Sequence, residues 1–114
     1  MHELSIALSI VELAEEEAEK NGGGRVNAVH LRLGLLSGVV KDALLGSYEL
    51  ACAGTVLEGS RLIIEEIPVV GYCSKCETPR NVDSVQWFVC PECSTPMSEV
   101  LQGRELQVAA LEIE

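Results

Sequence analysis

Residues 73–93, CSKCETPRNVDSVQWFVCPEC, contain two Cys-x-x-Cys pairs that are separated by thirteen residues. Each pair places two thiols on one tight turn, and two such turns can surround one ion tetrahedrally, which is the geometry of structural zinc. The spacing therefore predicts a Zn(II) site whose ligands are Cys73, Cys76, Cys90 and Cys93. Iron in a rubredoxin-like site uses the same four thiolates, and the spacing leaves both metals open.

The predicted site is structural, because a closed shell of four thiolates has no open position for a substrate. The segment around it is too short to build a core of its own, so the bound ion would supply the free energy that folds it. A thioredoxin-like redox role needs one Cys-x-x-Cys pair and not two, and is therefore disfavoured.

A change in composition marks this segment as an insertion. Residues 70–102 hold four of the five cysteines and three of the four prolines. They also lack the periodicity of a helix. We expect an inserted zinc-binding domain at 70–102, with Pro68 and Gly103 near its hinges. Residues 1–69 together with 103–114 would form the other domain.

The flanking sequence predicts helices and strands in alternation. Asn21 and three glycines end a first helix at residues 4–20, whose apolar positions recur at helical spacing: Leu4, Ala7, Leu8, Val11, Ala14 and Ala18. A second helix is predicted from Val40 to near Gly54, and strands are predicted at 25–33, 61–69 and 104–114. This order predicts an α/β (α+β) fold, with two helices on one face of a small sheet of about three strands.

The charge of the chain argues against nucleic-acid and membrane binding. Eighteen acidic and eight basic side chains give a net charge of −10, which repels phosphate backbones and favours cations and basic partners. The cysteine-rich segment contains only Lys75 and Arg80 as basic residues, with Arg104 just beyond it. Trp87 and Phe88 are better explained as packing between the two cysteine turns than as a base-stacking surface.

The start of the chain does not have the form of a secretory signal. No basic residue precedes the apolar residues 4–11, and the acidic run ELAEEEAEK follows. We expect a cytoplasmic protein, in a reducing compartment where cysteines bind metals more often than they form disulfides. Cys52 is predicted to be a small buried side chain. His30 is predicted to face solvent from a strand and not to bind a metal.

The first three residues, Met1, His2 and Glu3, bring an amine, an imidazole and a carboxylate together. The amino group of Met1, with the backbone and ring nitrogens of His2, can chelate one ion. Glu3 can add a donor through its backbone nitrogen or its carboxylate. A nitrogen-rich, tetragonal set of this kind suits Ni(II) or Cu(II). Protons compete for the amine and the imidazole, so the affinity should fall as the pH drops.

The sequence does not predict an enzyme. It offers no open metal site with a general base and no nucleophile–base pair. The run NGGGR has no lysine-serine sequel and so is not a phosphate-binding loop. Ile6 stands where a His-Glu-x-x-His zinc motif would need its second histidine.

Taken together, five features of the chain resemble the HypA/HybF family of hydrogenase-maturation nickel metallochaperones. They are the Met-His-Glu start, the glycine stop after the first helix, the segments LRLGLLSGV and ACAGT, and the paired cysteine turns. The resemblance covers essentially the whole chain. It implies that Ni(II) binds at Met1, His2 and Glu3, and that structural Zn(II) binds at the two cysteine pairs. It further implies delivery of nickel to the large subunit of NiFe-hydrogenase, with a HypB-type nickel GTPase as partner, and it allows a homodimer. Some relatives carry a histidine beside the cysteines that rearranges the zinc shell. Here there is none, so such switching is not expected.

A second hypothesis keeps the zinc segment and omits the carrier role. In it, the chain is a zinc-ribbon protein-interaction module without nickel transfer, and the opening Met-His-Glu is incidental. The two hypotheses differ in one measurable respect. A carrier loses nickel binding when the amino terminus is blocked or when His2 becomes alanine, whereas an interaction module is unaffected.

Overall fold

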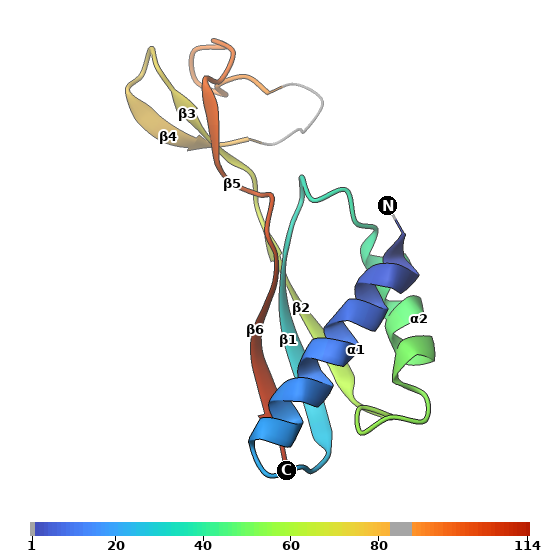
Figure 1. Ribbon diagram of the computed structural model, residues 1–114. Coiled ribbons are helices and arrows are strands. Elements are labelled where there is room, and N and C mark those ends of the chain that lie inside the picture. Colours follow the sequence, from blue (N-terminus) through green and yellow to red (C-terminus); the bar gives the residue numbers. More distant parts are fainter. Residues whose placement is uncertain (1, 83–87) are drawn as a thin grey trace. The chain divides into compact units, whose positions relative to one another are not determined.

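The computed structural model describes residues 2–82 and 88–114. In chain order, its elements are α1 (Glu3–Lys20), β1 (Val26–Gly34), α2 (Lys41–Cys52), β2 (Arg61–Ile67), β3 (Val70–Cys73), β4 (Thr78–Asn81), β5 (Glu99–Gln102) and β6 (Leu106–Ile113) (Figure 1). The strands form two three-stranded sheets, with the orders β2-β1-β6 and β4-β3-β5. None of the helices described is both long enough and apolar enough to span a membrane.

The chain divides into two compact units. The first unit comprises Met1–Leu31, Val39–Glu65 and Gln107–Glu114, and the second comprises Arg32–Gly38 and Glu66–Leu106. The first unit holds both helices, and the second holds the cysteine-rich segment with its own small sheet.

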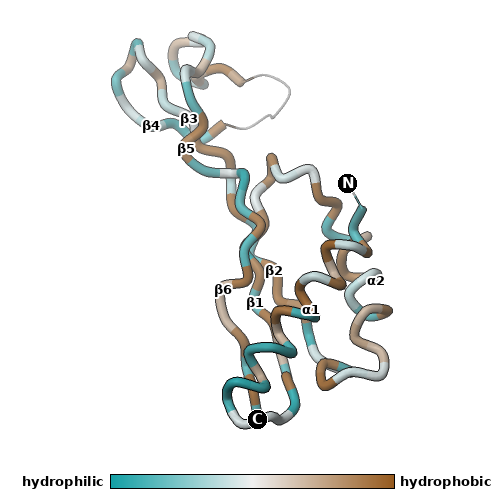
Figure 2. Tube along the Cα trace, in the orientation of Figure 1, coloured by the Kyte–Doolittle hydropathy of each residue, from teal (hydrophilic) through white to brown (hydrophobic). Residues whose placement is uncertain are grey.

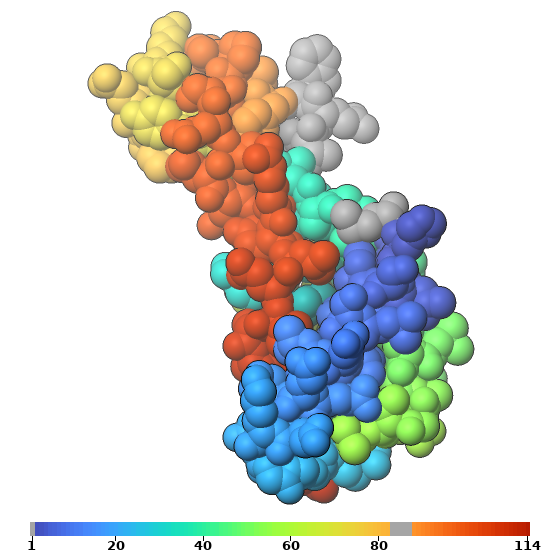
Figure 3. Space-filling model, viewed as in Figure 1, coloured from blue at the N-terminus to red at the C-terminus, as the bar shows by residue number. Residues whose placement is uncertain are grey.

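Helix α1 buries a narrow, mostly small-residue face, and its other faces lie on the surface of the first unit (Figure 3). The buried residues recur at helical spacing: Ala7, Ile10, Val11, Ala14 and Ala18. Two of the apolar positions that predicted the helix, Leu4 and Leu8, are 47% and 51% exposed. Both leucines lie at the edge of the buried face of α1, whose centre is close to Ala7 and Ala14. Acidic residues make the second half of this helix polar (Figure 2).

The core of the first unit lies between the two helices and one face of the sheet. Leu44, Tyr48 and Cys52 of α2 pack in one cluster with Val29 and Leu31 of β1, and both helices lie on the same face (Figure 1). This arrangement confirms the predicted α+β class. Cys52 is 3% exposed, as predicted for a small buried side chain.

The opposite face of the sheet carries a polar pair. His30 lies between Val29 and Leu31 in β1, and its side chain is 38% exposed. Because neighbouring residues of a strand point to opposite faces, His30 points away from the core. Its Nε2 lies 2.7 Å from Oε2 of Glu112 on β6.

The small sheet of the second unit was not predicted from the sequence. Strand β3 pairs antiparallel with β4, with Cys73 opposite Thr78, and also with β5. Each of these strands has only four residues, which is too short for a pattern of alternation to be recognised. The strand predicted at 61–69 also ends earlier, at Ile67, before Pro68, and the chain resumes as β3 at Val70.

A close approach of two glycines joins the segments of the second unit. Leu36 N donates a hydrogen bond to the Gly103 carbonyl at 2.6 Å, and Gly103 has a φ of 123°. A Cβ atom on Gly34 would overlap that same carbonyl and would lie 2.7 Å from Arg104 N. Position 34 therefore has no room for a side chain.

Replacing Gly34 with alanine should lower the free energy of unfolding by about 1–3 kcal/mol, because the backbone must shift to admit the methyl group. Gly46 in α2 provides the control, since a Cβ there would meet no atom within 4 Å. Gly46→Ala should raise the free energy of unfolding by about 0.5–1 kcal/mol, because glycine is unfavourable within a helix. Urea denaturation of both variants measures the effects, and changes of the same sign would contradict this packing.

Candidate metal centres

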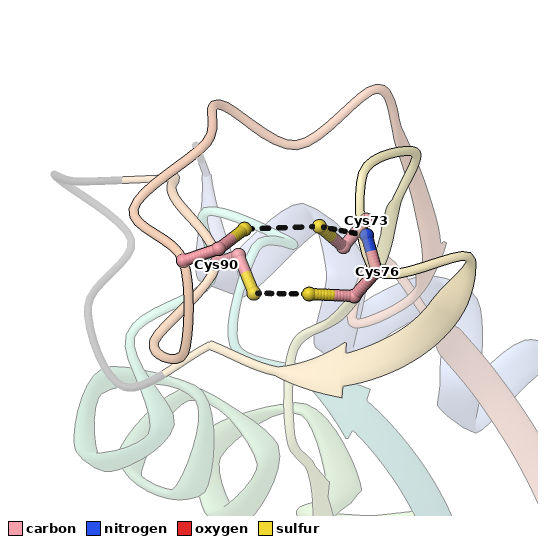
Figure 4. Close-up of side chains that lie close together, drawn as sticks. Cys73, Cys76 and Cys90 are labelled. Carbon is pink, nitrogen blue, oxygen red and sulfur yellow. Dashed lines mark hydrogen bonds between the residues drawn. The ribbon is translucent and has the colours of Figure 1, made fainter.

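Four cysteine sulfurs come together in the second unit (Figure 4). Cys73 lies at the end of β3 and Cys76 in the turn before β4, while Cys90 and Cys93 lie in the segment between β4 and β5. The four Sγ atoms all lie within 4.8 Å of one another. Cys73 Sγ is 3.4 Å from Cys93 Sγ, and Cys76 Sγ is 4.0 Å from Cys90 Sγ.

These separations fit a metal shell. In a tetrahedral site with zinc–sulfur bonds of about 2.3 Å, neighbouring sulfurs lie about 3.8 Å apart. The observed sulfur–sulfur distances of 3.4 and 4.0 Å are close to this value. They are too long for a disulfide bond, and all five cysteines are free. Four soft thiolates suit zinc or iron and do not suit magnesium or calcium. The residues present therefore fit the expected structural ion.

The local backbone shapes both cysteine turns. Glu77 and Ser94, the residues that follow the second cysteine of each pair, have φ values of 52° and 62°. This left-handed conformation reverses the chain directly after the ligand. Cys76 N donates to Cys73 Sγ at 3.3 Å, and Ser94 N donates to the Cys90 carbonyl at 2.8 Å. Each turn thus holds its two sulfurs on one side.

The electrostatic environments of the thiols differ. Thr95 Oγ1 lies 3.2 Å from Cys93 Sγ, and the hydroxyl and backbone amide of Thr95 lower the pKa of Cys93 to about 6. Arg80 lowers the pKa of Cys76, but the neighbouring Cys93 and Cys73 thiols act against it and the pKa rises to about 11. Like charges at this spacing disfavour ionisation, and a bound cation removes that penalty.

The predicted nickel ligands lie at the start of α1, in the first unit. His2 is the exposed N-cap residue, and its carbonyl accepts the first helical hydrogen bond, from Ile6 N at 3.2 Å. Glu3 is the first helical residue, and its Oε2 accepts a hydrogen bond from Val40 N at 3.1 Å. Met1 lies outside the described residues. The structure thus describes two of the three predicted residues and gives the carboxylate of Glu3 a partner on the segment that begins α2.

Three contacts around these sites were missed in the sequence analysis. The contact between Glu3 and Val40 joins residues 37 positions apart, and no local pattern indicates it. The contact of Arg80 with Cys76 depends on the pairing of β3 with β4. Thr95 could have been found, because a hydroxyl two residues after a ligand cysteine is close enough to form a hydrogen bond with its sulfur. Trp87, expected to pack between the turns, lies outside the described residues. Phe88 does lie close to β3, since a Cβ on Gly71 would be 2.9 Å from its Cζ.

Replacing Cys90 with serine should reduce the zinc content from about one ion per chain to nearly none, because the shell loses a soft ligand. Amide exchange should accelerate across residues 70–82 and 88–102, where the ion supplies the folding energy. Elemental analysis and hydrogen-exchange mass spectrometry measure both effects. Cys52→Ser is the matched control, since Cys52 lies in the core of the first unit, and it should keep its zinc. Stoichiometric zinc with unchanged exchange in Cys90→Ser would refute the assignment.

Replacing Glu3 with glutamine should make the stability of the first unit less dependent on pH. The Val40 amide and the amide of Glu3 itself lower the pKa of the Glu3 carboxyl. A lowered pKa means that the ionised carboxylate stabilises the fold at neutral pH, and that this stabilisation is lost as the pH falls below about 4. Glu3→Gln should therefore unfold more easily than the native chain at pH 7, with the difference shrinking in acid. Thermal melts followed by far-ultraviolet circular dichroism test this, with the exposed Glu16→Gln as control. A difference that stays constant down to pH 3 would contradict it.

Comparison with known sequences agrees with the resemblance noted above. The HypA family model, described as "Hydrogenase/urease nickel incorporation, metallochaperone, hypA", matches residues 1–113. A hydrogenase maturation factor HypA from Roseiflexus sp. (strain RS-1) is 54% identical over 114 residues, which cover 100% of this chain and 93% of the relative. The hydrogenase maturation factor HypA from Geobacter metallireducens is 44% identical, with 100% of both chains covered.

Solved structures agree with the sequence match. The solution structure of the Ni metallochaperone HypA from Helicobacter pylori is 25% identical, with a TM-score of 0.66 over 99% of this chain and 97% of that one. Another solution structure of a HypA protein is 26% identical, with a TM-score of 0.73 over 100% of this chain and 97% of that one. The chain therefore belongs to the HypA family of nickel metallochaperones, which act in hydrogenase maturation.

Proposed function

We propose that this protein binds Ni(II) at Met1, His2 and Glu3 and delivers it to the large subunit of NiFe-hydrogenase. The observation that carries the proposal is the exposed position of His2 at the start of α1, directly before Glu3. The first amides of a helix have no intrahelical acceptor. The backbone nitrogens at this helix start are therefore available to an ion without breaking the helix.

The proposed ligands are the amino group of Met1, the backbone and imidazole nitrogens of His2, and the backbone nitrogen of Glu3. The Glu3 carboxylate accepts hydrogen bonds from Val40 N and from the Glu3 amide. An ion bound at the Glu3 nitrogen replaces only the second of these and leaves the link to Val40 in place, so the nitrogen is favoured over the carboxylate. Four nitrogens make a tetragonal set, which suits Ni(II) better than tetrahedral Zn(II). The deprotonated amides also carry negative charge, which offsets the unfavourable field that a helix start presents to a cation.

An exposed site suits a carrier, because the ion must leave as well as bind. Ligands from an acceptor can approach an exposed ion and replace the donors one at a time. Protons compete with nickel for the amine and the imidazole, so binding should weaken as the pH falls. The net charge of −10 attracts cations to the surface, although salt screens this attraction.

The remaining parts of the proposal concern the zinc site, the partners and the setting. Zn(II) at the four cysteines is structural, in an inserted domain at residues 70–102, while 1–69 with 103–114 form the nickel-binding domain. The protein is not an enzyme. It acts in the cytoplasm with a HypB-type nickel GTPase as a further partner, and it can form a homodimer.

Nickel titration of four forms of the protein tests the carrier function. The tag-free chain should bind Ni(II) tightly, and both His2→Ala and a short amino-terminal extension should abolish tight binding, because each removes a chelating nitrogen. His30→Ala is the matched control. It removes the other histidine of the chain, which is paired with Glu112 on the sheet, and should leave nickel binding unchanged. Isothermal calorimetry and the visible absorption of bound nickel measure both outcomes.

Equal nickel binding by the native, extended and His2→Ala forms would refute the amino-terminal site. The zinc-ribbon interaction module without nickel transfer would then be the better account of the chain.

A further inference from the structure

Arg80 lies on the same face of the small sheet as a zinc-ligand position. In the register of the β3–β4 pair, Arg80 is opposite Gly71 and Thr78 is opposite Cys73. Residues two apart along a strand share one face. Arg80 therefore projects from the hairpin on the side where Cys73 lies. Gly71 has no side chain, and this leaves room for Phe88 and Met97 beside it. A Cβ atom placed on Gly71 would lie 2.9 Å from Cζ of Phe88 and 3.1 Å from Cγ of Met97.

The guanidinium of Arg80 reaches the cysteine cluster. A side-chain hydrogen bond from Arg80 lowers the pKa of the Cys76 thiol, and the charge of Arg80 also interacts with Cys90 and Glu92. Its Nε is buried and has no hydrogen-bond partner among the described residues. A buried N–H without a partner is costly unless a charge nearby compensates for it. Metal-bound thiolates would supply that negative charge.

The two partly exposed sulfurs of the cluster each have a separate hydrogen-bond partner. Cys73 and Cys90 are fully buried, whereas Cys76 and Cys93 are partly accessible. Thr95 contacts Cys93, and Arg80 contacts Cys76. The accessible sulfurs are the ones that an electrophile or a competing chelator can reach first, so a hydrogen-bond partner at each of these two positions shields the vulnerable ligands.

The charge of the site explains why one of these donors is a cation. Four thiolates around one Zn(II) carry a net charge of 2−, within a chain that is already at −10. Residues 70–102 contain only two basic side chains, and one of them, Lys75, is exposed. Arg80 is the one whose guanidinium hydrogen-bonds a ligand sulfur, and hydrogen bonds from charged donors are stronger than neutral ones.

We propose that Arg80 is a positioning residue of the four-cysteine site, which neutralises part of its charge and holds the Cys76 thiolate on the ion. The proposal rests on the assignment of a zinc site made above. It assigns Arg80 two measurable effects: it slows the loss of zinc, and it makes Cys76 less reactive towards electrophiles. A hydrogen bond to a thiolate withdraws charge from the sulfur, which makes it less reactive towards electrophiles. The positive charge of the guanidinium offsets part of the 2− charge of the loaded site, which disfavours protonation and release of Cys76.

Zinc-loaded full-length Arg80→Gln should lose zinc affinity by about 10- to 100-fold in competition with a chromophoric chelator, as is usual when a partner of a metal ligand is removed. Alkylation with iodoacetamide, resolved by residue with mass spectrometry, should accelerate at Cys76 relative to Cys93. Lys75→Gln and Arg104→Gln remove the same charge from exposed positions and should change the affinity by no more than about twofold. Arg80→Lys keeps the charge but loses the planar fork, so its affinity should lie between those of Arg80→Gln and the native chain.

Three results would overturn the proposal: unchanged zinc affinity in Arg80→Gln, equal acceleration at all four cysteines, or the same loss in Lys75→Gln. If Arg80→Gln does not fold, Arg80→Lys decides, because an unchanged ratio of Cys76 to Cys93 alkylation there would overturn the role of the hydrogen bond. A native chain that binds no zinc would refute the zinc site as well. A native chain that holds zinc, with an Arg80→Gln variant that holds it equally, would refute only the role of Arg80.

Discussion

Repulsion between four thiolates is the constraint on which the second unit depends. The sulfurs lie within 4.8 Å of one another, and at that spacing the ionisation of one thiol opposes the ionisation of the next. Strands of four residues in a segment of this size cannot supply a core that outweighs such repulsion. A divalent cation turns the same geometry from repulsive to attractive. Folding of this segment and metal binding are therefore expected to be one process.

The first unit is stabilised in a different way, by apolar packing that needs no ion. Alanines on the buried face of α1 let it pack closely on α2 and the sheet, while the acidic residues of its second half lie mostly on exposed faces. The hydrogen bond from Val40 N to Glu3 joins the starts of the two helices. That bond holds the backbone next to His2 in place, although chain ends are usually mobile. A ligand held in place before binding loses less conformational entropy when it takes an ion than a disordered one, which favours the proposed use of His2.

The parts of this structure that sequence analysis predicted are those with local causes. The cysteine cluster follows from spacing within two short turns, and α1 and Cys52 follow from periodicity over a few residues. The exposure of Leu4 and Leu8 did not follow from this periodicity, because the centre of a buried face depends on the neighbouring helix. Strands β3, β4 and β5 and the contacts of Arg80 and Glu3 depend on pairings between distant residues. No pattern in a single stretch of sequence indicates such pairings.

The two candidate metal centres differ in how easily they can exchange an ion. In the cysteine cluster, two of the four sulfurs are buried and each accessible sulfur has a hydrogen-bond partner, so a competing ligand finds few points of attack. At the helix start, His2 is exposed, and the nitrogens beside it can be protonated or displaced in turn. Slow exchange suits an ion that maintains a fold, and fast exchange suits an ion that is carried. The donor chemistry agrees with the proposed division, because four soft thiolates suit a tetrahedral zinc or iron and the proposed nitrogen donors would suit a tetragonal nickel.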